Sequence, residues 1–460
     1  MTDAATATAR PAPEREGFFR QKLRNLELLL LVFACVIDAG AIILVQLGAL
    51  GAIDTTLVSL GAGLSALVLA VHVVLRFAAP AADPFLLPIA TVLNGLGVAE
   101  IYRIDIADGV IGWDSVAVRQ LFWSGLAVVA AIVVLLVIRN HRVLFRYTYV
   151  AGLAAVVLLL LPLLPFIGRE VSGARVWIGI GDVASFQPGE IAKIALAVFF
   201  AGYLVRNRDS LSMVGRTVLG MRFPRLRDLG PILVVWAVTM GVIVFQRDLG
   251  TALLYFGLFL VMLYVATGRT SWVLIGVGLF LGGALLASQM LSYVGNRFAN
   301  WLEPFSAERY GADPGGSYQL VQGLFGLAHG GLIGTGLGQG MPGITPVPQS
   351  DYIIASLGEE LGLAGLFAIF GLYLLLVSRG FRIGFAGQDD FGRLLGVGLS
   401  FVIALQCFIV IGGVTRVIPL TGLTTPFLAA GGSSLVANWM IVAVLLRLSD
   451  TVRSQPRLVV

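Results

Sequence analysis

Twelve runs of apolar residues, each close to the length of a membrane-spanning helix, limit what this sequence can fold into. A helix needs about 20 mostly apolar residues to cross a bilayer. The runs fall at about 26–47, 56–77, 84–101, 119–138, 146–167, 187–205, 229–246, 250–267, 271–294, 351–378, 391–413 and 420–446. Only 12% of the residues are charged, whereas soluble domains carry about 25%. We therefore predict an all-α polytopic membrane protein with about twelve transmembrane helices.

Two of these runs carry polar interruptions. The run at 187–205 contains Glu190 and Lys193, and the run at 420–446 is broken by Pro426 and a Gly-Gly-Ser-Ser group. Charged side chains inside a membrane are costly, so they are expected to face each other or a polar cavity. Glu190 and Lys193 lie one turn apart on a helix that Pro188 is well placed to begin.

Arginines in the short loops predict the orientation of the helices. They cluster before the first run, between runs four and five, six and seven, and ten and eleven, and after run twelve. With twelve spans, all of these clusters fall on one side, so the positive-inside rule places both termini in the cytoplasm. The tails at 1–25 and 449–460 are then cytoplasmic, and the first is expected to be disordered. The net charge of +5 reports this orientation and does not predict a nucleic-acid partner.

The long loop at 295–350 falls on the extracellular side and leads into Asp351. We interpret its Gly-rich middle as a mobile lid with re-entrant turns. Pro348 keeps the preceding backbone extended and an apolar run follows at once, so Asp351 is expected in the first turn of a helix at the outer membrane boundary. There Asp351 can serve as an N-cap. Partly desolvated beneath the loop, it can also serve as a general base.

Other polar residues near the outer face have simpler interpretations. Asp248, in the turn QRDLGTA, is expected to cap the next helix. Glu359 and Glu360 lie two to three turns beyond the start of their run and are expected to hold that helix by pairing with a cation or a backbone group. Arg175 and Trp177 suit an interfacial segment, with the indole at headgroup depth.

Four short stretches together resemble one protein family in their order and spacing. They read GARVWIGIG…FQPGEIAK, QRDLGTA, PVPQSDYIIASLGEELGLAG and IPLTGLTTPFLAAGGSSLVANW. They resemble the SEDS proteins (shape, elongation, division and sporulation), the RodA and FtsW family, over about 84–448. The family core has ten spans, so the resemblance makes 26–80 a pair of additional N-terminal helices. The elongation branch, typified by RodA in an actinobacterium, is the expected subgroup.

The resemblance implies a peptidoglycan glycosyltransferase. Such an enzyme polymerises lipid II at the outer face of the bacterial cytoplasmic membrane, among membrane lipids, and works with a class B penicillin-binding transpeptidase. The family's essential aspartate maps to Asp351. Arg175 is displaced by one residue from the usual Arg-Trp pair, Gly189 replaces a serine and Arg247 replaces a proline. The retained motif positions, which we assign to the substrate site or to its support, are Trp177, Gln187, Glu190, Lys193, Asp248, Ser433 and Ser434.

The implied reaction assigns a role to each candidate. A sugar hydroxyl attacks the anomeric carbon of a second lipid II molecule, and Asp351 is the candidate base. The departing pyrophosphate needs cations, for which Arg175, Lys193 and Arg297 are candidates. A Mg²⁺ or Mn²⁺ ion held by Asp351, the pyrophosphate and water would leave little trace in the sequence. One base and inverted stereochemistry fit a single displacement.

Two other function classes remain open from the sequence. A lipid II flippase or transporter would also have about twelve spans, broken helices and intramembrane Glu and Lys residues. A scaffold without catalysis, which only activates a penicillin-binding partner, is the other alternative. The long loop above Asp351 favours the enzyme, because a transporter gains little from an external carboxylate beneath a lid.

Overall fold

The computed structural model describes residues 13–171, 173–180, 184–212, 217–218, 221–222, 225, 229–312 and 315–454. Within these residues, nine helices are long and apolar enough to cross a membrane. They are α1 (Pro13–Leu50), α2 (Thr55–Ala78), α4 (Val116–Val137), α7 (Pro188–Ser212), α9 (Leu249–Thr267), α10 (Thr270–Met290), α14 (Ile353–Phe385), α15 (Asp390–Val414) and α16 (Gly432–Ser454). The predicted all-α polytopic membrane fold is therefore confirmed.

The three remaining apolar runs also fold as helices. One is α3 (Leu86–Ala107), which has the length of a span but carries three buried charged residues near its end. Another is α6 (Thr148–Leu160) with a following 3-10 turn, and the third is α8 (Gly230–Gly241), which continues into a π-helical turn at Val242–Gln246. Each of the twelve predicted runs thus contains a helical segment, although the run at 420–446 is helical only from Gly432 onward.

The ends of the chain differ from the sequence-based expectation. Helix α1 already begins at Pro13, where a disordered tail through residue 25 was predicted. The physical reason is that Arg24 is buried, lies 2.5 Å from Glu27 and donates to the Ala82 carbonyl, so this polar turn packs against the bundle. At the other end, α16 continues to Ser454, beyond the predicted start of the C-terminal tail at 449. Residues 1–12 and 455–460 lie outside the described chain.

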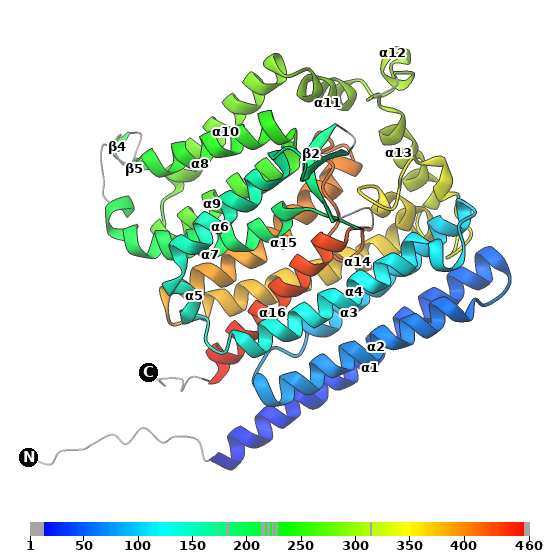
Figure 1. Ribbon diagram of the computed structural model, residues 1–460, viewed down its shortest axis with the longest axis horizontal. Coiled ribbons are helices and arrows are strands. Elements are labelled where there is room, and N and C mark those ends of the chain that lie inside the picture. The colour runs from blue at the N-terminus through cyan, green and yellow to red at the C-terminus, as the bar shows by residue number, and fades with distance from the viewer. Residues whose placement is uncertain are drawn as a thin grey trace, which may run out of the picture.

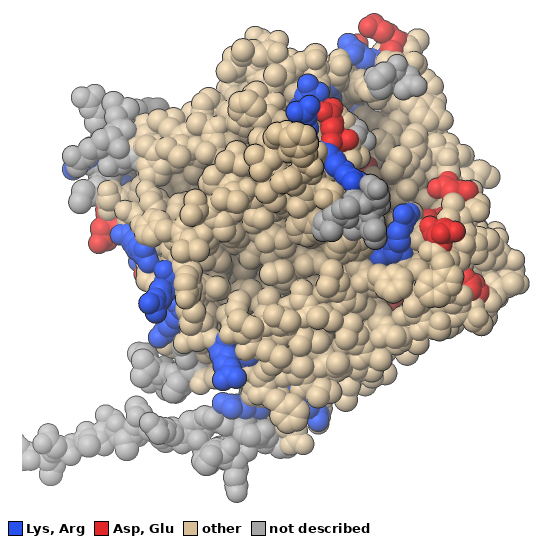
Figure 2. All heavy atoms as spheres, in the orientation of Figure 1, with Lys and Arg blue, Asp and Glu red and all other residues tan. Residues whose placement is uncertain are grey.

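The two ends of the helical bundle differ in charge. Helix α1 begins and α16 ends at the same end of the bundle, which also holds α5 (Arg142–Arg146) and the short strands β4 (Thr217–Val218) and β5 (Met221–Arg222) (Figure 1). Figure 2 shows Lys and Arg side chains along the lower-left edge, at this end, and Asp and Glu side chains along the right edge. This asymmetry agrees with the arginine pattern of the loops.

The opposite end carries the structured loops. A three-stranded antiparallel sheet forms from β1 (Gly168–Val171), β2 (Ala174–Ile180) and β3 (Ala184–Phe186), where the sequence predicted only an interfacial segment. The predicted loop at 295–350 contains helices, namely α11 (Ser292–Leu302), α12 (Ala307–Tyr310), α13 (Tyr318–Gly330) and a 3-10 turn at Pro342–Ile344. In Figure 1 these elements lie above the ends of α9, α14 and α15.

Close helix packing holds the segments that converge below these loops. The additional pair α1 and α2 packs on α3 and α4, and α4 packs on α16. A Cβ atom on Gly97 of α3 would lie 2.4 Å from the Leu428 carbonyl, so this glycine lets the segment before α16 lie directly on α3. Small residues allow such close approach between membrane helices, where lipid offers no hydrophobic driving force.

Candidate functional site

Asp351 lies two residues before α14 begins, at the end of the bundle opposite to the described chain ends. Its side chain is half-buried, and the Ser350 hydroxyl lies 2.9 Å from Asp351 Oδ1. Burial raises the pKa of the Asp351 carboxyl, although the Ser350 hydroxyl and the Arg297 guanidinium both act to lower it. The N-cap position of α14 is occupied by Tyr352 without a side-chain cap, so the interpretation of Asp351 as an N-cap is wrong. The carboxylate is therefore available for another role.

Arg297 reaches this region from α11. Its guanidinium donates to the Leu420 carbonyl at 2.8 Å and lies close to Gly422, on the segment between α15 and α16. The same segment is held a second time, because Trp301 Nε1 donates to the Arg416 carbonyl at 3.0 Å. The outer loop and the 415–431 segment thus form one connected structure around Asp351.

Several residues with strained backbone angles lie on the segments around Asp351. Among the described residues, five that are not glycine have a positive φ angle, and three of them lie on the segments that meet at the site: Val347 (48°), Arg416 (60°) and Phe427 (66°). For a β-branched residue such as Val347 this conformation is unusual and costs free energy. Such strain persists only where the surrounding structure holds it, and it is typical of functional sites.

The predicted ion pair between Glu190 and Lys193 forms at the start of α7. Lys193 Nζ lies 2.5 Å from Glu190 Oε2, and it also donates to Gln406 Oε1 at 3.0 Å and Asn438 Oδ1 at 3.1 Å. Two of its three N–H donors thus have hydrogen-bond acceptors, and its charge is balanced by the ion pair with Glu190. The ammonium group therefore joins α7 to α15 and α16 inside the bundle.

Ser433 and Ser434 lie in the first turn of α16, and both are buried. Asn438 Nδ2 donates to Ser434 Oγ at 3.3 Å, which connects this turn to the Lys193 network. Nearby buried oxygen atoms have no hydrogen-bond partner within the described chain, namely Gln349 Oε1, Thr424 Oγ1, Thr425 Oγ1 and Ser433 Oγ. Unpaired buried polar atoms are costly, so this lining is suited to a ligand that carries hydroxyl or amide groups.

The remaining predicted residues lie further from Asp351 or serve local structure. Asp248 caps α9, as its side chain accepts from the Thr251 amide at 2.9 Å. Arg175, on β2, pairs with Glu170 at 2.9 Å, and both side chains are exposed. Trp177 faces Arg169 across the β1–β2 pair and is half-buried. The Gln187 carbonyl accepts from the Glu190 amide at 3.1 Å, which closes the first turn of α7.

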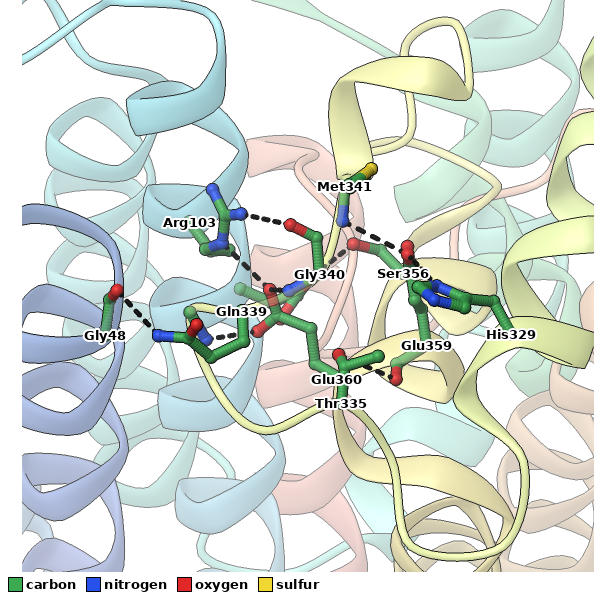
Figure 3. Close-up of polar contacts among 12 residues, drawn as sticks. Gly48, Arg103, His329, Thr335, Gln339, Gly340, Met341, Ser356, Glu359 and Glu360 are labelled. Carbon is green, nitrogen blue, oxygen red and sulfur yellow. Dashed lines mark hydrogen bonds and ion pairs between the residues drawn. The ribbon is translucent and has the colours of Figure 1, made fainter.

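Glu360 anchors the Gly-rich segment that precedes Asp351 (Figure 3). Its carboxylate accepts from Arg103 Nε at 2.8 Å, from the Gly338 amide at 2.8 Å and from the Gly340 amide at 3.2 Å. Arg103 also donates to the Gly340 carbonyl at 2.5 Å. The amides of this segment are thus directed at a carboxylate of α14, which occupies the donors that a phosphate group would need.

Glu359 holds the same segment from the other side (Figure 3). Its carboxylate accepts from the Met341 amide at 3.1 Å and lies 2.9 Å from His329 Nδ1. The additional helix α1 contributes as well, because Gln339 Nε2 donates to the Gly48 carbonyl at 2.8 Å. The Gly-rich segment is therefore tied to α3, α13, α14 and α1.

Metal-binding side chains do not gather at this site. Among the described residues, no group of three or more His, Cys, Asp or Glu side chains is arranged to hold a metal ion. Asp351 can offer one carboxylate to a divalent cation, and the other ligands would have to come from substrate and water.

A comparison with known protein families decides the relationship. The model of the FtsW/RodA/SpoVE family, described as cell cycle proteins, matches residues 84–454. The chain belongs to the FtsW/RodA/SpoVE family. The match covers α3 to α16 and leaves α1 and α2 outside it.

Relatives with curated names agree with this assignment. A protein of Mycobacterium tuberculosis named peptidoglycan glycosyltransferase RodA is 45% identical over 99% of this chain and 95% of its own length. A protein of the same name from Mycobacterium leprae is 44% identical over 94% of this chain and 91% of its own. Stage V sporulation protein E of Bacillus subtilis is 34% identical over 72% of this chain and 86% of its own length. The expectation of a RodA-type family member that is similar to actinobacterial RodA proteins is confirmed.

Solved structures share the fold. A chain reported under the description "Structural coordination of polymerization and crosslinking by a peptidoglycan synthase complex" has a TM-score of 0.63 and 25% identity. RodA of Thermus thermophilus has a TM-score of 0.54 and 25% identity. Each alignment covers 82% of this chain and 99% of the solved chain.

Sequence reasoning missed several residues that hold the site together. Gln406 and Asn438 bind Lys193, Arg103 binds Glu360, and Gln120 Nε2 donates to the Ala429 carbonyl at 3.2 Å. Gln120, Gln406 and Asn438 are polar side chains within apolar runs, and Arg103 lies two residues beyond one, which is a signal for a buried contact. Their partners lie 213 and 245 residues away for Lys193 and 257 residues away for Arg103, so the sequence alone does not pair them.

Proposed function

We propose that this chain is a peptidoglycan glycosyltransferase of the RodA type that polymerises lipid II during cell elongation. Membership of the family and the names of relatives with up to 45% identity support the enzyme class. The observation that carries the chemistry is Asp351, a half-buried carboxylate beneath the outer loops that no helix end uses as a cap.

Asp351 acts as the general base. The 4-hydroxyl of the acceptor sugar has a very high pKa, so it needs a proton acceptor as it attacks C1 of the donor. Burial raises the pKa of Asp351, which makes its carboxylate a stronger base than an exposed aspartate. General base catalysis is most effective when the pKa of the base lies near the working pH, and burial moves the pKa of Asp351 in that direction.

Arg297 is the preferred cation for the leaving pyrophosphate. It lies near enough to Asp351 to lower the pKa of that carboxyl, and its planar guanidinium suits phosphate oxygens. Lys193 takes a structural role, because two buried hydrogen bonds and the ion pair with Glu190 already hold its ammonium group. Arg175 remains a candidate at the edge of the site, and its exposed partner Glu170 holds it only weakly. A Mg²⁺ or Mn²⁺ ion would supply further positive charge at the pyrophosphate.

The reaction is a single displacement with inversion at C1. The oxygen of the acceptor hydroxyl forms the new bond to C1, the bond from C1 to the pyrophosphate oxygen breaks, and Asp351 takes the hydroxyl proton. The described geometry offers one carboxylate at this position, which fits a base acting on a sugar hydroxyl in place of water. No covalent enzyme intermediate is required.

The active face is the outer face of the cytoplasmic membrane. The arginine clusters at the opposite end of the bundle support cytoplasmic termini by the positive-inside rule. A class B penicillin-binding protein is the proposed partner, in line with the synthase complex that coordinates polymerization and crosslinking.

Polymer formation from lipid II tests the proposal. The purified full-length chain, with its penicillin-binding partner, is incubated with lipid II in detergent, and glycan strands are resolved on a gel. Asp351→Asn and Asp351→Ala are expected to lower the rate by about 10² to 10⁴ fold, the usual contribution of a general base. Asp248→Asn is the matched control, since it also alters an outer aspartate but one that caps a helix.

Three outcomes separate the alternatives. Loss of polymer in both Asp351 variants, with folding intact by size-exclusion chromatography, supports the base. Polymer from Asp351→Ala at the wild-type rate would remove Asp351 from the mechanism. No polymer from any form, together with transfer of lipid II across vesicle bilayers, would favour the flippase.

A further inference from the structure

A small cavity lies within the membrane-spanning region, where the additional helices α1 and α2 meet α3, α4 and α16. Its volume is about 20 Å³, and its polar lining residues include Asp38, Ser65, Thr91 and Asn94. A cavity needs about 10–15 Å³ to hold one water-sized sphere. The space therefore accepts a single water or an ion of similar size, and excludes a lipid headgroup.

Asp38 is an ionisable residue without a hydrogen-bond or ion-pair partner among the described residues. It is twelve residues before the end of α1, or about 18 Å along the helix, so it lies inside the hydrocarbon layer of about 30 Å. Its Oδ1 atom is buried and has no hydrogen-bond partner, and no ion pair reaches it from the described part of the chain. An ionisable residue inside a membrane is rare and usually functional.

The neighbouring helix is shaped to receive this carboxylate. A Cβ atom at Gly95 of α3 would lie 2.0 Å from Asp38 Cγ. Any other residue at this position would displace the carboxylate from the cavity. The Asp38 carboxyl therefore packs against the backbone of α3 at Gly95, between α1 and α3, and does not face lipid alone.

The hydroxyl groups of the lining offer lone pairs to the cavity. Ser65 Oγ donates its proton to the Gly61 carbonyl at 3.0 Å, and Thr91 Oγ1 donates to the Leu87 carbonyl at 2.9 Å. A hydroxyl has one proton, so both oxygens can act only as acceptors toward a further partner. Together with the Asp38 carboxylate, they form a set of oxygen acceptors, which attracts a hard cation.

From this arrangement we infer that α1, α2 and α3 form an intramembrane binding site for a single alkali cation of the sodium class, held by Asp38 with Ser65 and Thr91. One positive charge balances the one carboxylate, whereas a divalent ion would leave a net charge buried in lipid. Bound there, the cation joins the additional helix pair to the family core. The competing occupant is one water, bridging a neutral Asp38 carboxyl to Trp439 Nε1, which also lines the cavity and has no partner.

Thermal unfolding distinguishes the two occupants. The full-length protein is placed in phosphatidylcholine nanodiscs, and its Tm is followed by tryptophan fluorescence while NaCl replaces choline chloride at constant ionic strength. A ligand that binds only the folded state raises Tm in a saturable way. We expect such a rise for the wild type with Na⁺, a smaller rise with K⁺, and none for Asp38→Asn.

Matched variants on the same helix pair make the result specific. Ser65→Ala and Thr91→Val are expected to raise the half-saturating Na⁺ concentration by about tenfold, the lower end of the effect of losing a supporting group at a metal site. Ser59→Ala, on α2, and Asp54→Asn, at the α2 N-cap, should keep the wild-type response to Na⁺ even where Tm falls.

The wild type alone can overturn the inference. A Tm that is the same in NaCl, KCl and choline chloride would mean that Asp38 is neutral and that a water fills the cavity. An equal Na⁺ response in Asp38→Asn would place any cation elsewhere.

Discussion

At Asp351, opposing influences act on the proton affinity of one carboxyl group. Burial raises its pKa, while Ser350 and Arg297 lower it. A carboxyl whose pKa is higher in the folded state than in the unfolded chain binds its proton more tightly when folded. Its favourable contribution to stability is present at low pH and is lost as the pH rises through the folded pKa. At neutral pH the ionised carboxylate therefore costs stability, and Asp351→Asn should retain or raise Tm while activity is lost.

Arg297 allows the assigned base to be tested through the pH dependence of the rate. Arg297→Gln removes a cation that lowers the pKa of Asp351, so the acid limb of the pH–rate profile should move to higher pH. Arg297→Lys should leave the limb near its wild-type position. The measurement is the initial rate of glycan synthesis across the pH range.

Arg309→Gln is the control for this experiment. Arg309 lies in the same 295–350 loop, but its guanidinium donates to Asn296 and does not act on the pKa of Asp351. An acid limb that does not move in Arg297→Gln would show that Asp351 is not the group whose ionisation sets the rate.

The Lys193 network makes a further prediction about single residues. Lys193→Met leaves Glu190 buried without its cation, which should lower the free energy of unfolding by about 3–5 kcal/mol. Arg208→Met, on the same helix, removes an exposed ion pair with Asp390 and should cost at most about 1 kcal/mol. Denaturant unfolding in detergent compares them, and equal losses would contradict a buried structural role for Lys193.

At the scale of elements, α14 depends on the Gly-rich segment beside it. Gly362 interrupts the helix with φ of 67° and ψ of −173°, and the segment around Gly334 lies against that interruption. The amide of Leu363 donates to the Gly331 carbonyl and the amide of Ala364 to the Leu332 carbonyl, at 2.9 and 3.0 Å. The break in α14 therefore frees backbone amides that hydrogen-bond to the segment that precedes Asp351.

Two glycines with the same φ angle test the crowding at the break in α14. Gly362→Ala would place a Cβ atom 2.2 Å from the Gly334 amide nitrogen, whereas Gly51→Ala, also at φ of 67°, meets nothing within 4 Å. Both variants carry the cost of a positive φ angle, and Gly362→Ala also carries the strain of a ψ angle of −173°, a backbone region that essentially only glycine adopts. Only Gly362→Ala should also displace the Gly-rich segment and reduce polymerisation.

Tm and the polymerisation rate are measured for both alanine variants. Similar activity in the two would mean that the segment can shift without affecting the catalytic end of α14.

The sequence predicted the helices better than the loops. Apolar runs are long local signals, so every predicted run contains a helical segment, the last one only from Gly432 onward. The sheet that contains Trp177 was missed, although Val176, Trp177 and Ile178 are residue types that favour strands, because its hydrogen bonds join separate short segments. Asp351 and its helix could be predicted because their signals are local in the sequence. The pairing of Lys193 with Gln406 and Asn438 could not, because these partners come together only in the packed bundle.

For the whole molecule, the distribution of charge defines two chemically different ends. The basic end carries both described chain ends, and the other end carries α11 to α13 and the site (Figures 1 and 2). Because both sets of loops are joined by the same helices, one determination of sidedness orients every element.

Single cysteines can establish that orientation. In a background with Cys35 and Cys407 replaced by alanine, Ser306→Cys in the outer loop should react with an impermeant maleimide in intact cells. Gln388→Cys, between α14 and α15, should react only after the membrane is permeabilised. Labelling of both positions in intact cells, or the reverse pattern, would contradict cytoplasmic termini.

The order of synthesis adds a consequence of the contact between Arg103 and Glu360. These residues are 257 positions apart, so at about 5–20 residues per second roughly 13–51 s pass between their translation. During that interval Arg103, near the end of α3, lacks its partner Glu360. Helix α1 packs along α3 and is made before it. We expect deletion of residues 1–80 to increase degradation of newly made chains in pulse-labelled cells, and unchanged survival would contradict this. The additional pair would then act as an internal chaperone during membrane insertion.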